Sequence, residues 1–327
     1  MPTDLSQLSG RPNLAAHQAA ALLRHWRVVG TVQPLESERD QNWQVRVGGD
    51  PLYVLKVANQ ADSPAVIDLQ QQMMGQLASA GIPCPHAVLT VTGQRWLETC
   101  HHVVWLINWR PGRRLADVTA PPDAVFVDLG AVVARSAAAL AGFDHPAAHG
   151  RHLQWDMQHA GEVLAGYAHH VDAGSRRARV EQILDEYRRD VDPALRDLPR
   201  SVIHNDANDH NVLLHDDLVT GLLDFGDAVH GATVVDLAVA CAYAMLNRSA
   251  PARVADLLVA GYRQHRPLPP VERTVLPALV RTRLAMSVAI SAFQRTVHPD
   301  NAYLRVSEAP AWDLLDRDAL RAWTVTG

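Results

Sequence analysis

Two oxygen-bearing side chains, those of Asn211 and Asp224, are spaced as a divalent-metal site requires. Asn211 directly precedes one short apolar run, Asp224 directly follows another, and the polar residues 215–218 separate the two runs. This pattern predicts a β-hairpin, which brings residues on either side of its turn next to each other. Because an amide oxygen and a carboxylate are ligands that Mg²⁺ accepts, the hairpin predicts a magnesium site at its open end.

The loop before this hairpin holds a third candidate, Asp206, five residues ahead of Asn211. So short a loop leaves the carboxylate close to the metal pair, where it suits a base for a hydroxyl that attacks a metal-bound phosphate. Turns favour Asp and Asn in general. That preference does not explain His-x-Asp, an Asn five residues later and Asp-Phe-Gly after a hairpin, so the combination predicts phosphoryl transfer.

Lys56 is the single lysine among thirty basic residues, and all the others are arginine. It lies in the apolar run 52–58, which predicts a buried strand with Leu52, Val54 and Lys56 on one face. A position that keeps an ammonium group where the chain otherwise uses guanidinium predicts a functional role. The alternative is a lysine retained by chance on a solvated strand edge.

Composition limits the class of protein. The 327 residues carry a net charge of −5, which gives no reason to expect nucleic acid or an anionic membrane as a partner. No apolar run approaches membrane-spanning length and no signal-peptide pattern begins the chain, so we expect a cytoplasmic protein. The three cysteines lie far apart in the sequence, at positions 84, 100 and 241. This spacing predicts reduced, buried thiols at Cys84, Cys100 and Cys241. Adjacent histidines, at 101–102 and 169–170, do not predict a metal site, since neighbouring side chains diverge.

The elements that must position these residues fall into two groups. Residues 13–27 predict a helix and residues 66–80 a second one, which Gly81 and Pro83 end. Around them lie β-like runs separated by turn residues, at 28–35, 43–47, 52–58, 87–91, 94–98 and 103–109. The first third is therefore predicted to be a mainly antiparallel sheet that ends at Pro111-Gly112.

After this Pro-Gly hinge the periodicity becomes helical. The predicted helices span 126–141, 153–169, 176–189, 233–247, 252–264 and 271–296, with one β-like insertion at 202–224. We predict an α+β, bilobal fold: an N-lobe, residues 1–110, with an antiparallel sheet, and a mainly helical C-lobe, residues 111–327, with the catalytic loop and the acceptor site.

The central segment resembles a known family. The string His204-x-Asp206-x4-Asn211, followed by Asp224-Phe225-Gly226, resembles the catalytic and metal-binding loops of the protein-kinase-like fold. The versions H-N-D-x-N-D-x-N and G-L-L-D-F-G-D are similar to the hydroxylysine kinases and the aminoglycoside phosphotransferase-like group. They are also similar to kinase-like domains fused to bacterial class III aminotransferase-like lyases.

The resemblance implies a role for each matching residue. Asp206 would be the catalytic base and His204 a support for its loop, while Asn211 and Asp224 would hold Mg²⁺. Lys56 would reach the α- and β-phosphates of ATP or GTP. Asp236, a later match, would brace the catalytic loop.

The nucleotide site departs from the protein-kinase pattern in two places. The segment 36–43 takes the place of the phosphate-covering loop but has no glycine, so Ser37 and backbone amides would have to cap the phosphates. The acid that normally steadies the lysine aligns with Asp68, which is one methylene shorter than glutamate; a solvated helix residue is the equal alternative. Ile107 and Trp109 lie where the family binds the purine through its backbone, which does not distinguish ATP from GTP.

The resemblance also implies a small hydroxyl acceptor, an amino alcohol or a hydroxylated amino acid like hydroxylysine. Such an acceptor is cationic, so we expect carboxylates or aromatic faces around it, and the candidates are Asp227, Asp209 and Trp155. Any pyridoxal-phosphate lyase linked to this activity would be a separate protein. The alternatives are an antibiotic phosphotransferase of the aminoglycoside type and a non-catalytic nucleotide-binding module.

Overall fold

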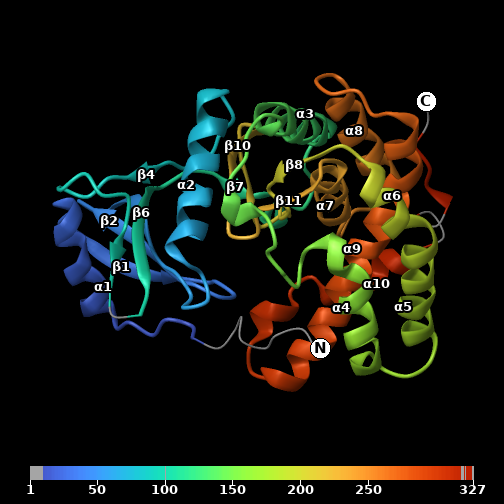
Figure 1. Ribbon diagram of the computed structural model, residues 1–327, viewed down its shortest axis with the longest axis horizontal. Helices are drawn as coiled ribbons and strands as arrows, with labels where there is room; N and C mark the ends of the chain where they lie inside the picture. The colour runs from blue at the N-terminus through green and yellow to red at the C-terminus, as the bar shows by residue number, and fades with distance from the viewer. Residues whose placement is uncertain (1–9, 100, 318–319, 321, 326–327) are drawn as a thin grey trace.

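The computed structural model describes residues 10–99, 101–317, 320 and 322–325, and its elements form two groups (Figure 1). The first group contains one antiparallel sheet with the strand order β1-β2-β3-β6-β4, in which β5 also pairs with β6. Two helices and one 3₁₀ turn accompany the sheet. The elements are α1 (Ala16–Leu22), η2 (Leu23–Trp26), β1 (Thr31–Leu35), β2 (Gln41–Val47), β3 (Asp50–Val57), α2 (Pro64–Ser79), β4 (Ala87–Val88), β5 (Leu97–Glu98) and β6 (Val103–Asn108).

Strand β3 runs through the middle of this sheet, between β2 and β6. Lys56 therefore lies on an interior strand, as predicted, and its side chain is 6% exposed. The turn before β3 uses Gly48 and Gly49 at positive φ, as expected of a tight hairpin. The β-like runs predicted at 87–91 and 94–98 shorten to the two-residue strands β4 and β5, and each of these pairs with β6.

The second group is mainly helical. Helix α9, near the C-terminus, is long and apolar enough to cross a membrane, contrary to the sequence expectation, but 89% of its apolar window is buried inside the protein. It packs against α4, α7 and α10, so its apolar character is that of a core helix. The helices are α3 (Asp123–Leu140), α4 (Ala160–Tyr167), α5 (Ser175–Glu186), α6 (Asp192–Asp197), α7 (Val234–Ala244), α8 (Pro251–Arg263), α9 (Pro270–Val297) and α10 (Glu308–Leu315).

Short strands between α6 and α7 carry the catalytic segment. β8 (Arg200–Ile203) pairs with β11 (Val229–Ala232), and β9 (Val212–His215) pairs with β10 (Leu218–Leu222) and β7 (Arg113–Arg114). The predicted hairpin is thus confirmed. Asp216 and Asp217 form its turn at positive φ, and the amide of Leu223 donates to the carbonyl of Asn211.

One predicted helix starts later than expected, and two of the predicted thiols are confirmed. The helix expected over 153–169 begins only at Ala160, because Asp156 caps a separate 3₁₀ turn, η5 (Met157–His159), before it. Cys84 and Cys241 are buried free thiols, as predicted, whereas Cys100 lies outside the described residues.

Candidate active site

The catalytic loop is held by a buried carboxylate on the next helix. Asp236, in the first turn of α7, accepts hydrogen bonds from the backbone amides of His204 and Asn205, at 3.0 and 2.6 Å. Asn205 adopts a left-handed backbone, φ 64°, that a free chain visits rarely. Burial raises the pKa of Asp236 to about 6. The loop geometry therefore depends on one acid that binds two consecutive amides.

His204 links this loop to the hairpin. Its Nδ1 accepts from the amide of Asp206, at 3.2 Å, and its Nε2 lies 3.0 Å from the carbonyl of Leu223. These partners require a neutral ring with the proton on Nε2. Burial agrees with this state, because it lowers the pKa of His204 to about 4. The ring thus fixes the positions of Asp206 and Asp224 relative to each other.

The carboxylate of Asp206 is surrounded by donors. Its Oδ2 accepts from Nδ2 of Asn211, at 2.7 Å, and its Oδ1 accepts from Asn208 and from Arg283, at 2.9 and 3.0 Å. Desolvation, together with the nearby charge of Asp227, nevertheless raises the pKa of Asp206 well above its usual range. A carboxylate with a raised pKa accepts a proton more readily than an ordinary aspartate does.

Asp224 lies in the opposite electrostatic environment. Its Oδ1 is 3.4 Å from Nζ of Lys56, and this cation lowers the pKa of Asp224 below its usual value. Lys56 also lies 3.8 Å from Oδ2 of Asp40, in the loop between β1 and β2. Burial opposes the charge of Lys56, but the two carboxylates outweigh it and raise the pKa of the ammonium group.

Asp68 does not pair with Lys56, and here the sequence expectation is corrected. The carboxylate of Asp68 instead binds Arg95, at 2.7 Å, and also contacts Gln72 and His145. It does not line the cleft. The acid beside the lysine is Asp40, which the β1–β2 loop delivers without the longer side chain that a helix position would need.

A cleft of about 720 Å³ lies between the two groups of elements and is lined by the predicted nucleotide residues other than Asp68. Ser37, Ile107 and Trp109 line it together with Lys56 and Asp224. The backbone amide of Trp109 already donates to the carbonyl of Leu52, at 2.7 Å, so this amide is not free for a purine. The carbonyl of Ser37 accepts from Arg11, which holds one side of the glycine-free loop.

A smaller annex of about 110 Å³ opens from this cleft. Asp206 borders both spaces, so a group bound in the annex lies beside the catalytic loop. Two of the acceptor-site candidates, Trp155 and Asp227, line the annex. Asp209 does not: it faces an adjoining pocket, and its carbonyl accepts from the amide of Ala116.

The annex also contains charged residues that the sequence analysis did not single out. Glu38 lies beside Trp155 in the lining of the annex, and desolvation raises the pKa of Glu38. Arg39 binds Asp227 at 2.6 Å and so neutralises the carboxylate of Asp227, one of the predicted acceptor-site residues. Within the described residues Glu38 has no ion pair, so it is the carboxylate that remains for a cationic ligand.

Two signals in the sequence mark these missed residues. The consecutive charges Glu38, Arg39 and Asp40 occupy the loop where glycine is expected, and Arg283 interrupts an apolar helical run. A cation at such a position must find a partner. Arg283 is 1% exposed and binds Asp206 as well as the carbonyl of Trp155, at 2.6 Å. Tyr303, whose pKa burial raises to about 12, lines both spaces and carried no recognisable signal.

The residues present fit a hard divalent cation. Asn211 directs its Nδ2 to Asp206, which leaves its Oδ1 as a ligand, and Asp224 is ionised and 46% exposed to the cleft. These are one amide and one carboxylate oxygen, with room for phosphate oxygens and water to complete the shell.

Comparisons with known proteins agree with this geometry. The model of the phosphotransferase enzyme family matches residues 31–273. The hydroxylysine kinase of Danio rerio is 30% identical, over 98% of this chain and 97% of that protein. The hydroxylysine kinase of Mus musculus is 28% identical, over 95% and 91%. A homoserine kinase of Methylobacillus flagellatus is 32% identical over 73% of this chain and 72% of its own length.

Among solved structures, a microcompartment-associated aminopropanol kinase superposes with a TM-score of 0.75 at 20% identity, covering 95% of this chain and 99% of that one. This likeness concerns the fold and confirms the predicted bilobal, protein-kinase-like architecture. Since the family model covers most of the chain and relatives matched over nearly their full length are 28% and 30% identical to it, the chain belongs to the phosphotransferase enzyme family and is a phosphotransferase that acts on the hydroxyl group of a small molecule.

Proposed function

We propose that this protein transfers the γ-phosphate of ATP or GTP to the hydroxyl of an amino alcohol or a hydroxylated amino acid, with hydroxylysine as the model acceptor. The observation that carries the proposal is the position of Asp206 between the cleft and the annex. A hydroxyl in the annex lies beside the carboxylate, and a nucleotide in the cleft presents its phosphates from the other side. The names of the full-length relatives, hydroxylysine kinases, support this acceptor class.

Each residue then has a role. Asp206, whose pKa is raised, orients the acceptor hydroxyl and takes its proton as the oxygen attacks phosphorus. Lys56 binds the α- and β-phosphates, and Asp40 holds the ammonium group in place. Asn211 and Asp224 would hold Mg²⁺, which neutralises phosphate charge and orients the transferred group. Arg283 keeps the carboxylate of Asp206 aimed at the annex.

The annex favours a small cationic acceptor. Glu38 offers a half-buried carboxylate without an ion pair among the described residues, and a carboxylate suits an ammonium group. The annex, of about 110 Å³, is small for an aminoglycoside-type antibiotic, which makes that alternative the weaker one. A non-catalytic module has no need for Lys56, Asp206 and both metal ligands together.

We also propose a division into lobes at residues 110 and 111, since the hinge residues Trp109 and Arg110 line the cleft between the two groups of elements. A cytoplasmic location and a functional link to a separate pyridoxal-phosphate lyase belong to the same proposal. The resemblance of the catalytic segment to kinase domains fused to lyases supports the link.

The test is a nucleoside-diphosphate release assay with Mg²⁺ and either ATP or GTP. The acceptors are hydroxylysine, homoserine, 1-amino-2-propanol, ethanolamine, choline and an aminoglycoside. We expect turnover with one of the compact amines, and Asp206→Asn should lower kcat by about 10²–10⁴ with nucleotide affinity unchanged. Turnover of the aminoglycoside alone would overturn the acceptor class. Nucleotide binding without turnover of any acceptor would favour the non-catalytic module.

A further inference from the structure

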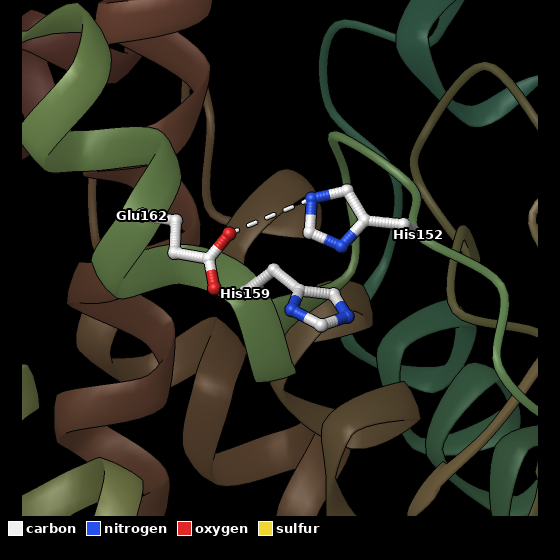
Figure 2. A group of neighbouring side chains, drawn as sticks. All are labelled: His152, His159 and Glu162. Atoms are coloured by element: carbon white, nitrogen blue, oxygen red, sulfur yellow. Dashed lines mark ion pairs between the residues drawn. The ribbon is translucent and has the colours of Figure 1, made fainter. Parts of the chain in front are cut away.

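A group of three side chains outside the candidate active site converges on one point of the C-lobe. His152 lies in the loop before η5, His159 is the last residue of η5, and Glu162 is in the first turn of α4. Each offers one ligand atom, and these atoms all lie within 4.8 Å of one another. Figure 2 shows the two imidazole rings and the carboxylate turned towards a common space.

The geometry is close to that of a metal site. Nε2 of His152 lies 3.6 Å from Oε2 of Glu162, and the two imidazole ring centroids are 4.1 Å apart. A tetrahedral ion with bonds of about 2.0–2.2 Å needs ligand atoms roughly 3.4 Å apart. Small side-chain rotations therefore suffice to close the site. Two imidazoles and one carboxylate suit zinc and related transition metals better than they suit Mg²⁺.

The backbone that carries His159 is already fixed. Asp156 caps η5 by accepting from the amide of Gln158, at 2.9 Å, and the hydroxyl of Tyr187 donates to the carbonyl of Met157, at 2.8 Å. Oδ2 of Asp156 lies 3.9 Å from Nε2 of His159. Coordination through Nδ1 of His159 leaves Nε2 facing this buried carboxylate, an arrangement that orients metal-binding histidines.

We propose that His152, His159 and Glu162 bind a divalent transition-metal ion, zinc foremost, and that the bound ion stiffens the wall of the acceptor annex. Three protein ligands leave a fourth position for water or an anion. The site is separate from the oxygen ligands Asn211 and Asp224, which suit a harder cation.

The proposed metal site is connected to the annex by the backbone between His152 and His159. An ion bound to His152 and His159 clips the ends of the six-residue stretch 153–158, which contains Trp155. Trp155 lines the annex together with Glu38, and its carbonyl accepts from Arg283, which binds Asp206. Arg151, directly before the first ligand, donates to the carbonyl of Ala228 at 2.6 Å and lies 3.6 Å from Asp62 of the other lobe. This part of the inference rests on the proposed function.

The binding test uses the full chain after treatment with a chelator, in excess Mg²⁺ and nucleotide so that the candidate active site is occupied. Titration with Co²⁺, followed by absorption in the visible range, and displacement by Zn²⁺ give stoichiometry and affinity. We expect one equivalent, with affinity lowered by at least about tenfold in His152→Ala, His159→Ala and Glu162→Gln. The matched controls, His17→Ala on α1 and Glu181→Gln on α5, should bind as the parent chain does.

Equal affinity in all variants, no binding at all, or binding that Asp224→Asn abolishes would overturn the site. The coupling is tested separately: Zn²⁺ should lower KM for the acceptor in the parent chain but not in Glu162→Gln, with KM for the nucleotide unchanged in both. If KM for the acceptor does not change with Zn²⁺, the coupling to the annex is wrong, but the metal site is not. Because the titration does not depend on turnover, it decides the site even if the proposed acceptor is wrong.

Discussion

The two ends of the cleft hold their carboxylates in opposite electrostatic states. At the nucleotide end, the ammonium group of Lys56 lowers the pKa of Asp224. At the acceptor end, desolvation raises the pKa of both Asp206 and Glu38, even though Arg283 contributes a positive charge there. Both ends contain a cation, and desolvation raises the pKa at both, so desolvation alone does not explain the difference.

The distinguishing feature is the balance of charge at each end. The cation nearest Asp224 is strong enough to outweigh desolvation, whereas the cation beside Asp206 competes with the neighbouring charge of Asp227. An acid that stays ionised suits metal binding, and one with a raised pKa suits proton transfer. One cleft thus supports two chemical tasks with the same side-chain type.

The largest effect is expected from breaking the nucleotide end. Lys56→Met removes the cation that both Asp40 and Asp224 contact, and we expect kcat/KM to fall by about 10²–10³. Steady-state kinetics with varied nucleotide would measure it. Asp68→Asn is the matched control, because Asp68 binds Arg95 outside the cleft. A loss in the control as large as that in Lys56→Met would mean that the helix acid acts on the lysine after all.

Removing the negative charge of Glu38 at the acceptor end should change KM for the acceptor rather than kcat. Glu38→Gln keeps the shape of the side chain and its contact with Trp155 but removes the charge, so KM for a cationic acceptor should rise by about 10–100-fold. Nucleotide KM should not change. Measurements with hydroxylysine and with a neutral hydroxyl compound of similar size separate the two cases: an equal loss for both would show that charge recognition is not the role of Glu38.

The imidazole ring of His204, which links the loop of Asp206 to the hairpin, should make the free energy of unfolding depend on pH. Burial holds the pKa of His204 at about 4, below its ordinary value of 6.5. The neutral ring therefore contributes stability that is present above the ordinary pKa and is lost as the pH falls towards the folded-state pKa. Between about pH 7.5 and about pH 5 this loss amounts to about 2 kcal/mol.

Urea unfolding at both pH values would measure this loss. His204→Gln should be less stable at the higher pH but should lack about 2 kcal/mol of the pH-dependent change. Other titrating groups contribute equally to both proteins and cancel in the difference. An unchanged pH dependence in the variant would place the titration elsewhere.

The smallest expected effect is a shift in the pKa of Asp206 when one of its charged neighbours is removed. Arg283 lowers the pKa of Asp206 and Asp227 raises it. Since the base must be ionised, the acidic limb of kcat/KM against pH should move to higher pH in Arg283→Met and to lower pH in Asp227→Asn. A shift in the same direction in both variants would contradict this electrostatic account.

The sequence predicted best those features that depend on local spacing. The hairpin that aligns Asn211 and Asp224, the interior position of Lys56 and the bilobal fold all follow from patterns within a few residues of one another. The partners of Lys56 and Asp206 did not follow, because Asp40 and Arg283 reach them through tertiary packing. The proposed metal ligands did not follow from the sequence either, because the two converging histidines, His152 and His159, lie seven residues apart across a loop and are not adjacent.

The three consecutive residues Glu38, Arg39 and Asp40 have a consequence for how the substrates bind. One residue touches the acceptor wall, the next binds Asp227 across the lobes, and the third lies beside the lysine of the nucleotide end. Each ligand contacts the same short loop, so a ligand that fixes the loop at one end also fixes the residue that the other ligand contacts. Thermodynamic linkage makes this effect mutual. The two substrates are therefore expected to bind with positive cooperativity, each raising the affinity for the other.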